Sequence, residues 1–554
     1  MRWLSLVLAL LVAASAAAAQ GPPPGGGTCA PGEAWATLDA NGVSVPVVGD
    51  GTLGWTSKDD SLPPWYEVPR GSGLSSMFTT TPWIGGYVGD ELRISAARYD
   101  SYEFWPGPLA ADGTPPADCA PYDRVWSVSR GDLAAYEATG AATADVREWP
   151  WQLGAPVVDG DGDAGNYDLA AGDRPAVSGD ETLWWVMNDA GGPHDETGSV
   201  PVRLEVQAEA FAVAAPTSTL VGAALHYATL YRYRMTYRGT EPLEDAYIAL
   251  HFQAQLGDFT DDYRGTDTTL GLTYAYNADN LDGLEGHPME GEYGVAPPAI
   301  GMLFLEIPST TDPVPPGLLS GHTRYYNNNT PNGDPTNAGA YRNYMTCRWR
   351  EGDPLTYGGG GIGGTEPTCY IYPGEPGTYW SEGCLDPACT VSNTPGFGRG
   401  LVTATGPFRM EPGQTETVTF AIVWARGSSN LDSVERLRGA ARVVHTAYLG
   451  GRYDPQAPVV PAPAPPPSQF GLGVSPSPFT SSTTVRYDVP EGAGTFRVSV
   501  YDALGRRVAV LADGVQAPGA YEATLNGATL APGVYVVRLE TRTASTARVI
   551  VRVR

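Results

Sequence analysis

Residues 229–239, TLYRYRMTYRG, alternate between large apolar side chains and arginine or threonine. Tyr231, Tyr233 and Met235 occupy every second position, and successive side chains of a strand point to opposite faces. The segment is therefore predicted to be a β-strand with one apolar face. Residues 201–214, PVRLEVQAEAFAVA, alternate in the same way, and 245–256, DAYIALHFQAQL, follow after a short turn. Together the three segments predict an antiparallel sheet that forms half of a sandwich.

The composition extends this prediction to the whole chain. Its 69 glycines and 50 prolines in 554 residues favour short strands joined by many loops. Helix-like spacing is limited to two candidates, 428–451 with Asn430 as the cap and 130–140, and both are expected to be packing helices. The chain is also too long for one core. We therefore predict a mainly all-β, multi-domain protein with an antiparallel β-sandwich body, few short helices and a C-terminal immunoglobulin-like sandwich of about seven strands.

Changes in composition along the chain suggest its division into segments. Arg2, the apolar run 4–12 and the alanines at 17–19 are typical of a secretory signal peptide. That run is too short to span a bilayer, and we expect no membrane span elsewhere. A proline-rich stretch, RYDPQAPVVPAPAPPPS (452–468), separates the body from a strand-rich tail. The predicted segments are a signal peptide (1–19), a Gly/Pro-rich leader (20–28), an N-terminal β-rich lobe with an acidic loop (29–200), an antiparallel β-sandwich lobe ending in a helix (201–450), a linker (451–472) and a C-terminal domain (473–554).

The charge balance limits the classes of partner that the protein can bind, and the cysteines indicate disulfides. With 34 basic against 61 acidic residues, the net charge of −27 makes nucleic acid and anionic membranes poor partners. Six cysteines in an exported chain favour disulfides over metal. Fifteen pairings are open, and among them we favour Cys29–Cys119 and Cys384–Cys389.

The most acidic loop is VVDGDGDAGNYDLAAGDRP (157–175). It is not an EF-hand, because Ala164 and Ala170 stand where that loop needs glycine and glutamate. Aspartates at alternate positions nevertheless suit Ca²⁺, which takes six to eight oxygen ligands. A solvated acidic turn is the alternative. We predict a structural Ca²⁺ site whose ligands are Asp159, Asp161, Asp163, Asp168 and Asp173.

Other polar groups are weaker candidates. The loop 188–198 contains Asp189, His194, Asp195 and Glu196. We favour a polar hairpin end for this loop, and the alternatives are a second cation site and an acid–base cluster. The segment 258–267 either binds Ca²⁺ weakly or faces water; its acids are Asp258, Asp261, Asp262 and Asp267. Four tryptophans either stack on sugars or, as we favour, pack in the core: Trp149, Trp151, Trp184 and Trp185. Signatures of serine hydrolases, zinc proteases and P-loop enzymes are missing, so no catalytic residue is predicted.

The tail resembles a known family. SPSPFTSSTTVRYDVP (475–490), VYDALGRRVAVL (500–511), LAPGVYVVRLE (530–540) and ARVIVRVR (547–554) occur in the order found in the type A C-terminal sorting domain of type IX secretion substrates, which is immunoglobulin-like and similar to a flagellar-hook-cap module. Ser477 departs from the family, which has asparagine at this position. The resemblance implies delivery to the outer cell surface or the medium through contact of 473–554 with the type IX secretion machinery.

The body resembles a large group of uncharacterised exported proteins. The similarity rests on segments such as EVPRGSG (67–73), WIGGYVGDELRISAARY (83–99) and GDETLWWVMNDAGGPHDETG (179–198). It implies exported, multi-strand cargo and supplies no catalytic residue. We therefore favour a non-enzymatic structural or adhesive body that meets a surface glycan or protein. The alternative is a secreted glycan-acting hydrolase or carbohydrate-binding module.

Overall fold

A computed structural model of the chain describes residues 29–55, 65–98, 101–283, 291–308, 322–325, 330–389, 399–451, 453, 470–490, 496–514, 519–541 and 545–553. The predicted signal peptide, the leader and most of the predicted linker lie outside these residues. The chain divides into two compact units, Met1–Val459 and Val460–Arg554.

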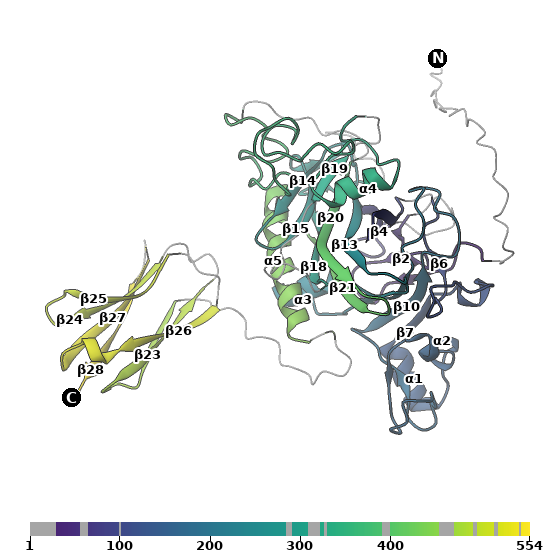
Figure 1. Ribbon diagram of the computed structural model, residues 1–554. Coiled ribbons are helices and arrows are strands. Elements are labelled where there is room, and N and C mark those ends of the chain that lie inside the picture. The colour runs from purple at the N-terminus through teal and green to yellow at the C-terminus, as the bar shows by residue number, and fades with distance from the viewer. Residues whose placement is uncertain are drawn as a thin grey trace, which may run out of the picture. The chain divides into compact units, whose positions relative to one another are not determined.

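The first unit contains two large antiparallel sheets (Figure 1). The eight-stranded sheet has the order β1-β2-β3-β4-β13-β20-β19, with β5 also paired to β4. Its strands are β1 (Trp35–Leu38), β2 (Val45–Val48), β3 (Leu53–Gly54), β4 (Met77–Val88), β5 (Glu91–Ala96), β13 (Leu243–Ala254), β19 (His322–Tyr325) and β20 (Gly400–Met410).

The nine-stranded sheet has the order β14-β15-β18-β21-β12-β11-β10-β6, with β7 also paired to β10. Its strands are β6 (Trp105–Pro106), β7 (Trp126–Ser129), β10 (Glu181–Asn188), β11 (Leu204–Ala212), β12 (Ala228–Tyr237), β14 (Asp262–Asp267), β15 (Leu272–Asn277), β18 (Ala299–Glu306) and β21 (Thr415–Ala425). Two short ribbons pair β8 (Val157–Val158) with β9 (Arg174–Pro175), and β16 (Leu281–Asp282) with β17 (Gly294–Val295).

One apolar core joins the two sheets. Tyr231, Tyr233 and Met235 of β12 point into it from the nine-stranded sheet, and Ile248 and Leu250 of β13 enter it from the eight-stranded sheet. All five side chains are fully buried. The alternation in 229–239 therefore has the predicted consequence, and the all-β sandwich class is confirmed.

The partners of β13 differ from the sequence expectation. β11 and β12 pair as predicted, but β13 lies in the facing sheet between β4 and β20. The reason is that both edges of β12 are already occupied, by β11 and β21. Both sheets consequently mix strands from before and after residue 200, so the predicted boundary between lobes 29–200 and 201–450 does not separate two folding units.

Helices cover the outer face of the nine-stranded sheet and its periphery. α5 (Asn430–Leu449) and α3 (Leu220–His226) pack an apolar cluster on that face, which Figure 1 shows beside β15 and β18. Both predicted helices are present, since α1 spans Arg130–Thr139. The cap of α5 is Ser429 and not Asn430, whose side chain instead donates to the carbonyl of Asn277. The remaining helices of the first unit are α2 (Ala144–Arg147), α4 (Ala338–Met345), η1 (Ala120–Tyr122) and η2 (Trp151–Leu153). The short helix η3 (Gly527–Thr529) belongs to the second unit.

The second unit is a small sandwich of seven described strands around its own core. Its three-stranded sheet is β22 (Gly471–Ser475), β23 (Ser482–Val489) and β26 (Gly519–Asn526), and its four-stranded sheet is β25 (Arg507–Gly514), β24 (Phe496–Asp502), β27 (Gly533–Thr541) and β28 (Ser545–Arg552). Ser477, the departure from the family pattern, accepts a hydrogen bond from Val551 N at 3.1 Å. It thereby ties the opening segment of the domain to its last strand.

Three disulfides connect the six cysteines: Cys29–Cys119, Cys347–Cys369 and Cys384–Cys389. The two predicted pairs are both present. The third closes the segment that follows α4.

Candidate functional site

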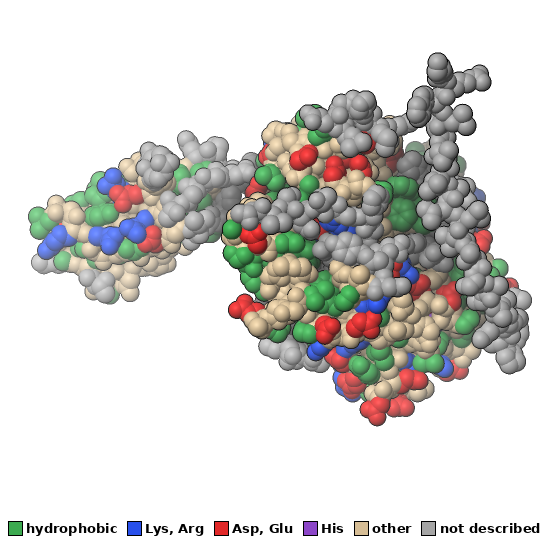
Figure 2. All heavy atoms as spheres, turned by 90° about the horizontal axis from the view of Figure 1, so that it is seen from above, with side chains coloured by type: hydrophobic (Ala, Val, Ile, Leu, Met, Phe, Trp, Pro, Cys, Tyr) green, Lys and Arg blue, Asp and Glu red, His purple; other side chains and the backbone are tan. Residues whose placement is uncertain are grey.

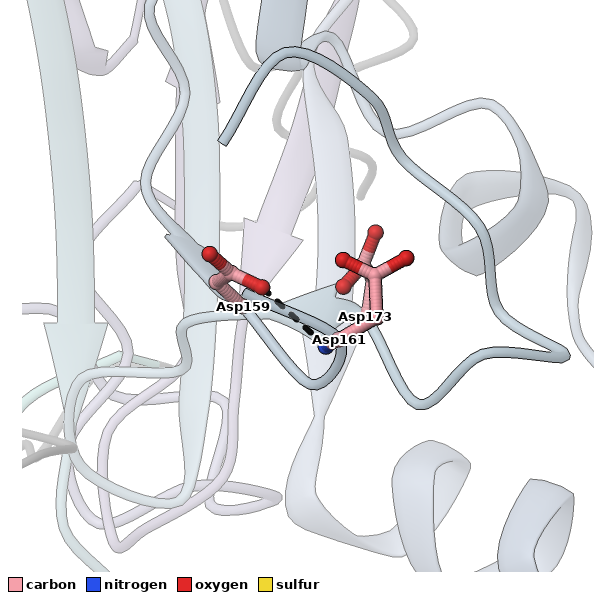
Figure 3. Close-up of side chains that lie close together, drawn as sticks. All are labelled: Asp159, Asp161 and Asp173. Carbon is pink, nitrogen blue, oxygen red and sulfur yellow. Dashed lines mark hydrogen bonds between the residues drawn. The ribbon is translucent and has the colours of Figure 1, made fainter. Parts of the chain in front are cut away.

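The acidic loop 159–173 is closed at its base by the β8–β9 ribbon. Because Asp159 follows β8 and Asp173 precedes β9, the ribbon brings the two ends of the loop together. One carboxylate oxygen from each of Asp159, Asp161 and Asp173 lies within 4.8 Å of the others. Figure 3 shows these three side chains gathered above the ribbon.

Backbone N–H groups hold these carboxylates in position. Asp159 Oδ1 accepts from the amides of Asp161 and Gly162, at 3.1 and 2.6 Å. Asp173 is buried and bridges the loop, because its oxygens accept from Gly160 N at 2.9 Å and Asp168 N at 2.7 Å. These two hydrogen bonds lower the pKa of Asp173, so its ionised form is favoured.

The other two predicted ligands are used differently. Asp163 Oδ1 accepts from Gly165 N at 3.0 Å, and Asp168 Oδ1 accepts from Ala170 N at 2.9 Å. Neither carboxylate belongs to the group of three, so the described structure brings together three of the five predicted ligands. Asn166, which the sequence analysis did not single out, donates from Nδ2 to Asp161 Oδ2 at 3.3 Å, and its buried Oδ1 has no hydrogen-bond partner. Its place between two aspartates was the only signal for it.

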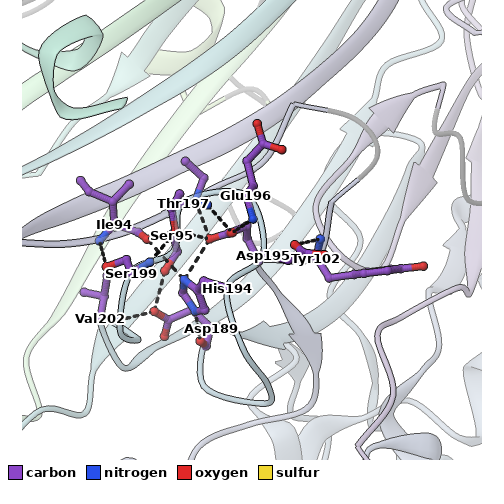
Figure 4. Close-up of polar contacts among 12 residues, drawn as sticks. Ile94, Ser95, Tyr102, Asp189, His194, Asp195, Glu196, Thr197, Ser199 and Val202 are labelled. Carbon is purple, nitrogen blue, oxygen red and sulfur yellow. Dashed lines mark hydrogen bonds and ion pairs between the residues drawn. The ribbon is translucent and has the colours of Figure 1, made fainter. Parts of the chain in front are cut away.

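The loop 188–198 forms a buried polar network (Figure 4). His194 Nδ1 lies 2.9 Å from Glu103 Oε2, and both side chains are fully buried. Asp189 accepts from the backbone amides of Val202 and Leu204 and from the hydroxyl of Ser95. These groups fasten the loop to β5 and to the start of β11.

The network sets the charge of His194. Burial lowers its pKa, but the hydrogen bond and charge of Glu103, together with the charge of Asp189, outweigh burial and raise the pKa to about 9. The remaining acids of the loop are also engaged: Asp195 accepts from Tyr102 N at 3.0 Å, and Glu196 pairs with Arg98 at 2.8 Å.

The segment 258–267 does not simply face water. Asp262 is fully buried at the start of β14, 3.7 Å from Arg264, and burial raises its pKa well above the usual range. Asp282, which the sequence analysis did not single out, accepts from the backbone amides of Asp258 and Tyr293. Burial raises the pKa of Asp282 to about 7 and that of Asp261 to about 6. This is a buried acidic group held by backbone amides and one arginine.

The tryptophans considered for sugar stacking pack inside the protein. Trp184 and Trp185 are 1% and 0% exposed, and Trp149 is 2% exposed. Trp151 is half-buried against the same small cluster as Trp149. Trp149, Trp184 and Trp185 therefore offer no face to a ligand, as favoured from the sequence.

The surface charge differs between the two units. Figure 2 shows acidic side chains spread over the visible face of the body and several basic ones on the tail. From residue 473 onward the sequence has nine arginines and six acidic residues, so the acidic excess of the chain lies entirely before the tail. Among the described residues, no helix combines the length and the apolar composition needed to cross a membrane.

Comparisons with known proteins bear on the tail. Residues 473–552 match the family model of a secretion system C-terminal sorting domain. No curated protein matches the chain. One solved structure, named a polysaccharide lyase, is similar at 7% identity with a TM-score of 0.24; the match covers 95% of this chain and 47% of that protein, so the chain spans about half its length.

The match at 473–552 covers nearly the whole of the small sandwich unit, from β22 to the end of β28. The motifs quoted above therefore lie on the strands of one domain with its own core. The C-terminal unit is a type IX secretion sorting domain, and the protein that carries it is exported to the cell surface or beyond it.

Proposed function

We propose that the body of this exported protein is a structural or adhesive component of the cell surface or extracellular space, and that Ca²⁺ stabilises its acidic loop. The observation that carries the calcium proposal is the convergence of oxygens from Asp159, Asp161 and Asp173 at the base of one loop. Three carboxylates at this separation repel one another, and a hard divalent cation removes that repulsion.

The chemistry of the donor set fits calcium. All the converging groups are oxygens, which hard cations prefer, and sulfur and imidazole are absent from the loop. The buried Oδ1 of Asn166 has no hydrogen-bond partner and belongs to the residue that contacts Asp161. It supports a fourth protein ligand, with carbonyl groups and water completing the shell. A closed loop of this kind, held by backbone amides, favours a structural role over a catalytic one.

The test is calcium-dependent stability of the purified protein. All 14 tryptophans precede the tail, so tryptophan fluorescence follows the unfolding of the body alone. Added Ca²⁺ should raise the melting temperature and a chelator should lower it, because a ligand that binds only the folded state stabilises it by about 2.7 kcal/mol at a hundredfold excess over Kd. Asp161→Ala should abolish this response.

Asp163→Ala is the matched control. Both variants lose one carboxylate and one hydrogen bond to a backbone amide, from Asp163 N and Gly165 N respectively, and Asp161→Ala also loses the long contact with Asn166 Nδ2. Only Asp161 belongs to the converging group. An unchanged melting temperature in the wild type on chelation, or an equal loss of the calcium response in both variants, would rule out the site.

The export function has its own test. Deleting 473–554 should leave the body in the periplasm, where immunoblots of cell fractions would detect it. Export of the truncated chain at the level of the full chain would contradict a sorting role for the tail.

Glycan recognition is the alternative function that the sequence left open. It loses support from the burial of Trp149, Trp184 and Trp185, since sugar-binding sites present aromatic faces to the ligand. A glycan-binding screen on the purified protein distinguishes the two proposals, because specific binding would favour the carbohydrate-binding module.

A further inference from the structure

A row of polar side chains crosses four adjacent strands on the outer face of the nine-stranded sheet. Glu209 of β11 lies opposite Arg232 of β12, Arg232 opposite Thr419 of β21, and Thr419 opposite Glu306 of β18. The neighbouring positions on β11, β12 and β21 point into the sandwich core, so these strands direct Glu209, Arg232 and Thr419 outward. Glu306 follows a register shift in β18 and accepts a hydrogen bond from Thr419. Helix α5 covers the apolar part of the same face and ends beside the row.

A cavity of about 630 Å³ opens where α5 ends. Three residues of the row line it, namely Glu209, Arg232 and Glu306. Tyr448 and Tyr453, at and beyond the end of α5, form another side of the cavity. Apolar walls come from Pro156, Ala176 and Leu305. The cavity thus combines two carboxylates and one guanidinium with apolar surface.

Three donors at the cavity are used by its own acceptors. Arg232 Nη1 donates to Glu209 Oε2 at 2.6 Å. The hydroxyl of Tyr448 donates to Glu306 Oε2 and lies 3.0 Å from Thr419 Oγ1, which itself donates to Glu306 Oε2 at 3.0 Å. One acceptor is left over: Glu209 Oε1 is buried and has no hydrogen-bond partner. The side chain of Glu209 is only 6% exposed, so bulk water does not satisfy this oxygen.

Glu209 lines the cavity, and its buried, unpartnered oxygen favours a donor bound there. An ammonium group offers three donors, no acceptor and a positive charge, whereas each hydroxyl of a neutral polyol is also an acceptor and carries no charge that would offset the carboxylates. The charges agree, since the lining carries two carboxylates against one guanidinium and the whole chain carries −27. We propose that this cavity binds the primary ammonium group of an organic molecule, with the carboxylates of Glu209 and Glu306 as its acceptors and the apolar walls around its aliphatic stem.

The proposal is independent of the calcium site and goes beyond the structural role proposed above. Two sources supply such a group, a free diamine or the lysine side chain of another protein. Isothermal titration of the purified full-length protein with 1,4-diaminobutane and with acetyl-Gly-Lys-Gly-amide separates them, since the source is the ligand that binds more tightly. The neutral isostere 1,4-butanediol and the peptide with acetylated lysine serve as uncharged controls.

Substitution of the acceptor tests the residue assignment. Glu209→Gln should weaken binding about tenfold or more, because it removes a charge-assisted hydrogen bond in a desolvated place. Glu306→Gln should also weaken binding, and because Glu306 is exposed this variant keeps the test valid if Glu209→Gln does not fold. Glu91→Gln removes the carboxylate of an exposed strand pair with Arg93 and should leave binding unchanged.

Three results would overturn the proposal. They are the absence of saturable binding by both ammonium probes, binding of 1,4-butanediol as tight as that of the diamine, and wild-type affinity in both glutamine variants. Saturable binding that only Glu209→Gln and Glu306→Gln weaken would support it.

Discussion

The buried pair of His194 and Glu103 makes the stability of the body depend on pH in a predictable direction. Both side chains are fully buried, with His194 Nδ1 and Glu103 Oε2 2.9 Å apart. The raised pKa of His194, about 9 against 6.5 in the unfolded chain, means that the folded state holds its proton more tightly. The stabilisation is therefore fully present below about pH 6.5 and is lost as the pH rises through about 9.

The size of the effect follows from the same two values. A difference of about 2.5 pKa units corresponds to about 3 kcal/mol, of which about 2 kcal/mol disappears between about pH 7.5 and pH 9.5. Other groups contribute little to the comparison in this window. Asp282, with a pKa of about 7, is largely ionised by pH 7.5, and the buried tyrosines are shared by the wild type and the variant.

The measurement is urea unfolding followed by tryptophan fluorescence at several pH values, which reports on the body alone. The free energy of unfolding of the wild type should fall across the window by about 2 kcal/mol more than that of His194→Gln. His445→Gln is the control, because burial lowers the pKa of His445 and the residue is uncharged in both states above pH 7.5. Equal slopes for the wild type and His194→Gln would refute the assignment of the proton to His194.

Two further predictions concern the sandwich core and the disulfides. Tyr233→Phe should leave the free energy of unfolding unchanged or raise it by about 1 kcal/mol, because the buried hydroxyl of Tyr233 has no hydrogen-bond partner. Tyr231→Phe should lower the free energy of unfolding by about 1 kcal/mol, because the hydroxyl of Tyr231 donates to Thr229 at 3.0 Å. Urea unfolding in which both variants lose stability equally would contradict this prediction. Replacing Cys29 and Cys119 by serine should lower the free energy of unfolding by about 4–5 kcal/mol, and replacing Cys384 and Cys389 should lower it by about 2 kcal/mol. The reason is that the first disulfide closes a sequence separation of 90 residues and the second a separation of 5. A larger loss of stability for the second pair in thermal melts would exclude loop closure as the cause.

Part of the acidic loop was predictable and part was not. Alternating aspartates at 159 and 161 are visible in the sequence, and their side chains lie together because they are neighbours along the chain. Asp173 joins them only because the β8–β9 ribbon returns the chain to its starting point. Asp163 and Asp168 follow the same compositional pattern, but their carboxylates accept from amides of their own turns. Composition alone does not distinguish these roles.

The polar row that lines the cavity was also predictable only in part. Glu209 and Arg232 stand at the outward positions of two alternating strands, so the sequence predicts that they leave the core. It gives no sign that Glu306 and Thr419 complete the row, since 306 and 419 are far apart along the chain and meet only through the pairing of β18 with β21.

The sequence by itself determined the local structure: strands from period-two alternation, the helix at 430–449 from its spacing, and the sorting domain from motifs that lie within one small unit. These features depend on neighbours along the chain, whose geometry the residue types fix. Only the tertiary structure decided that β13 leaves its neighbours for the facing sheet, that Asp262 is buried beside Arg264, and that Glu209 and Glu306 meet at one cavity. Those outcomes depend on which strand edges are free and which surfaces meet when the two sheets pack, and both are properties of the whole sandwich.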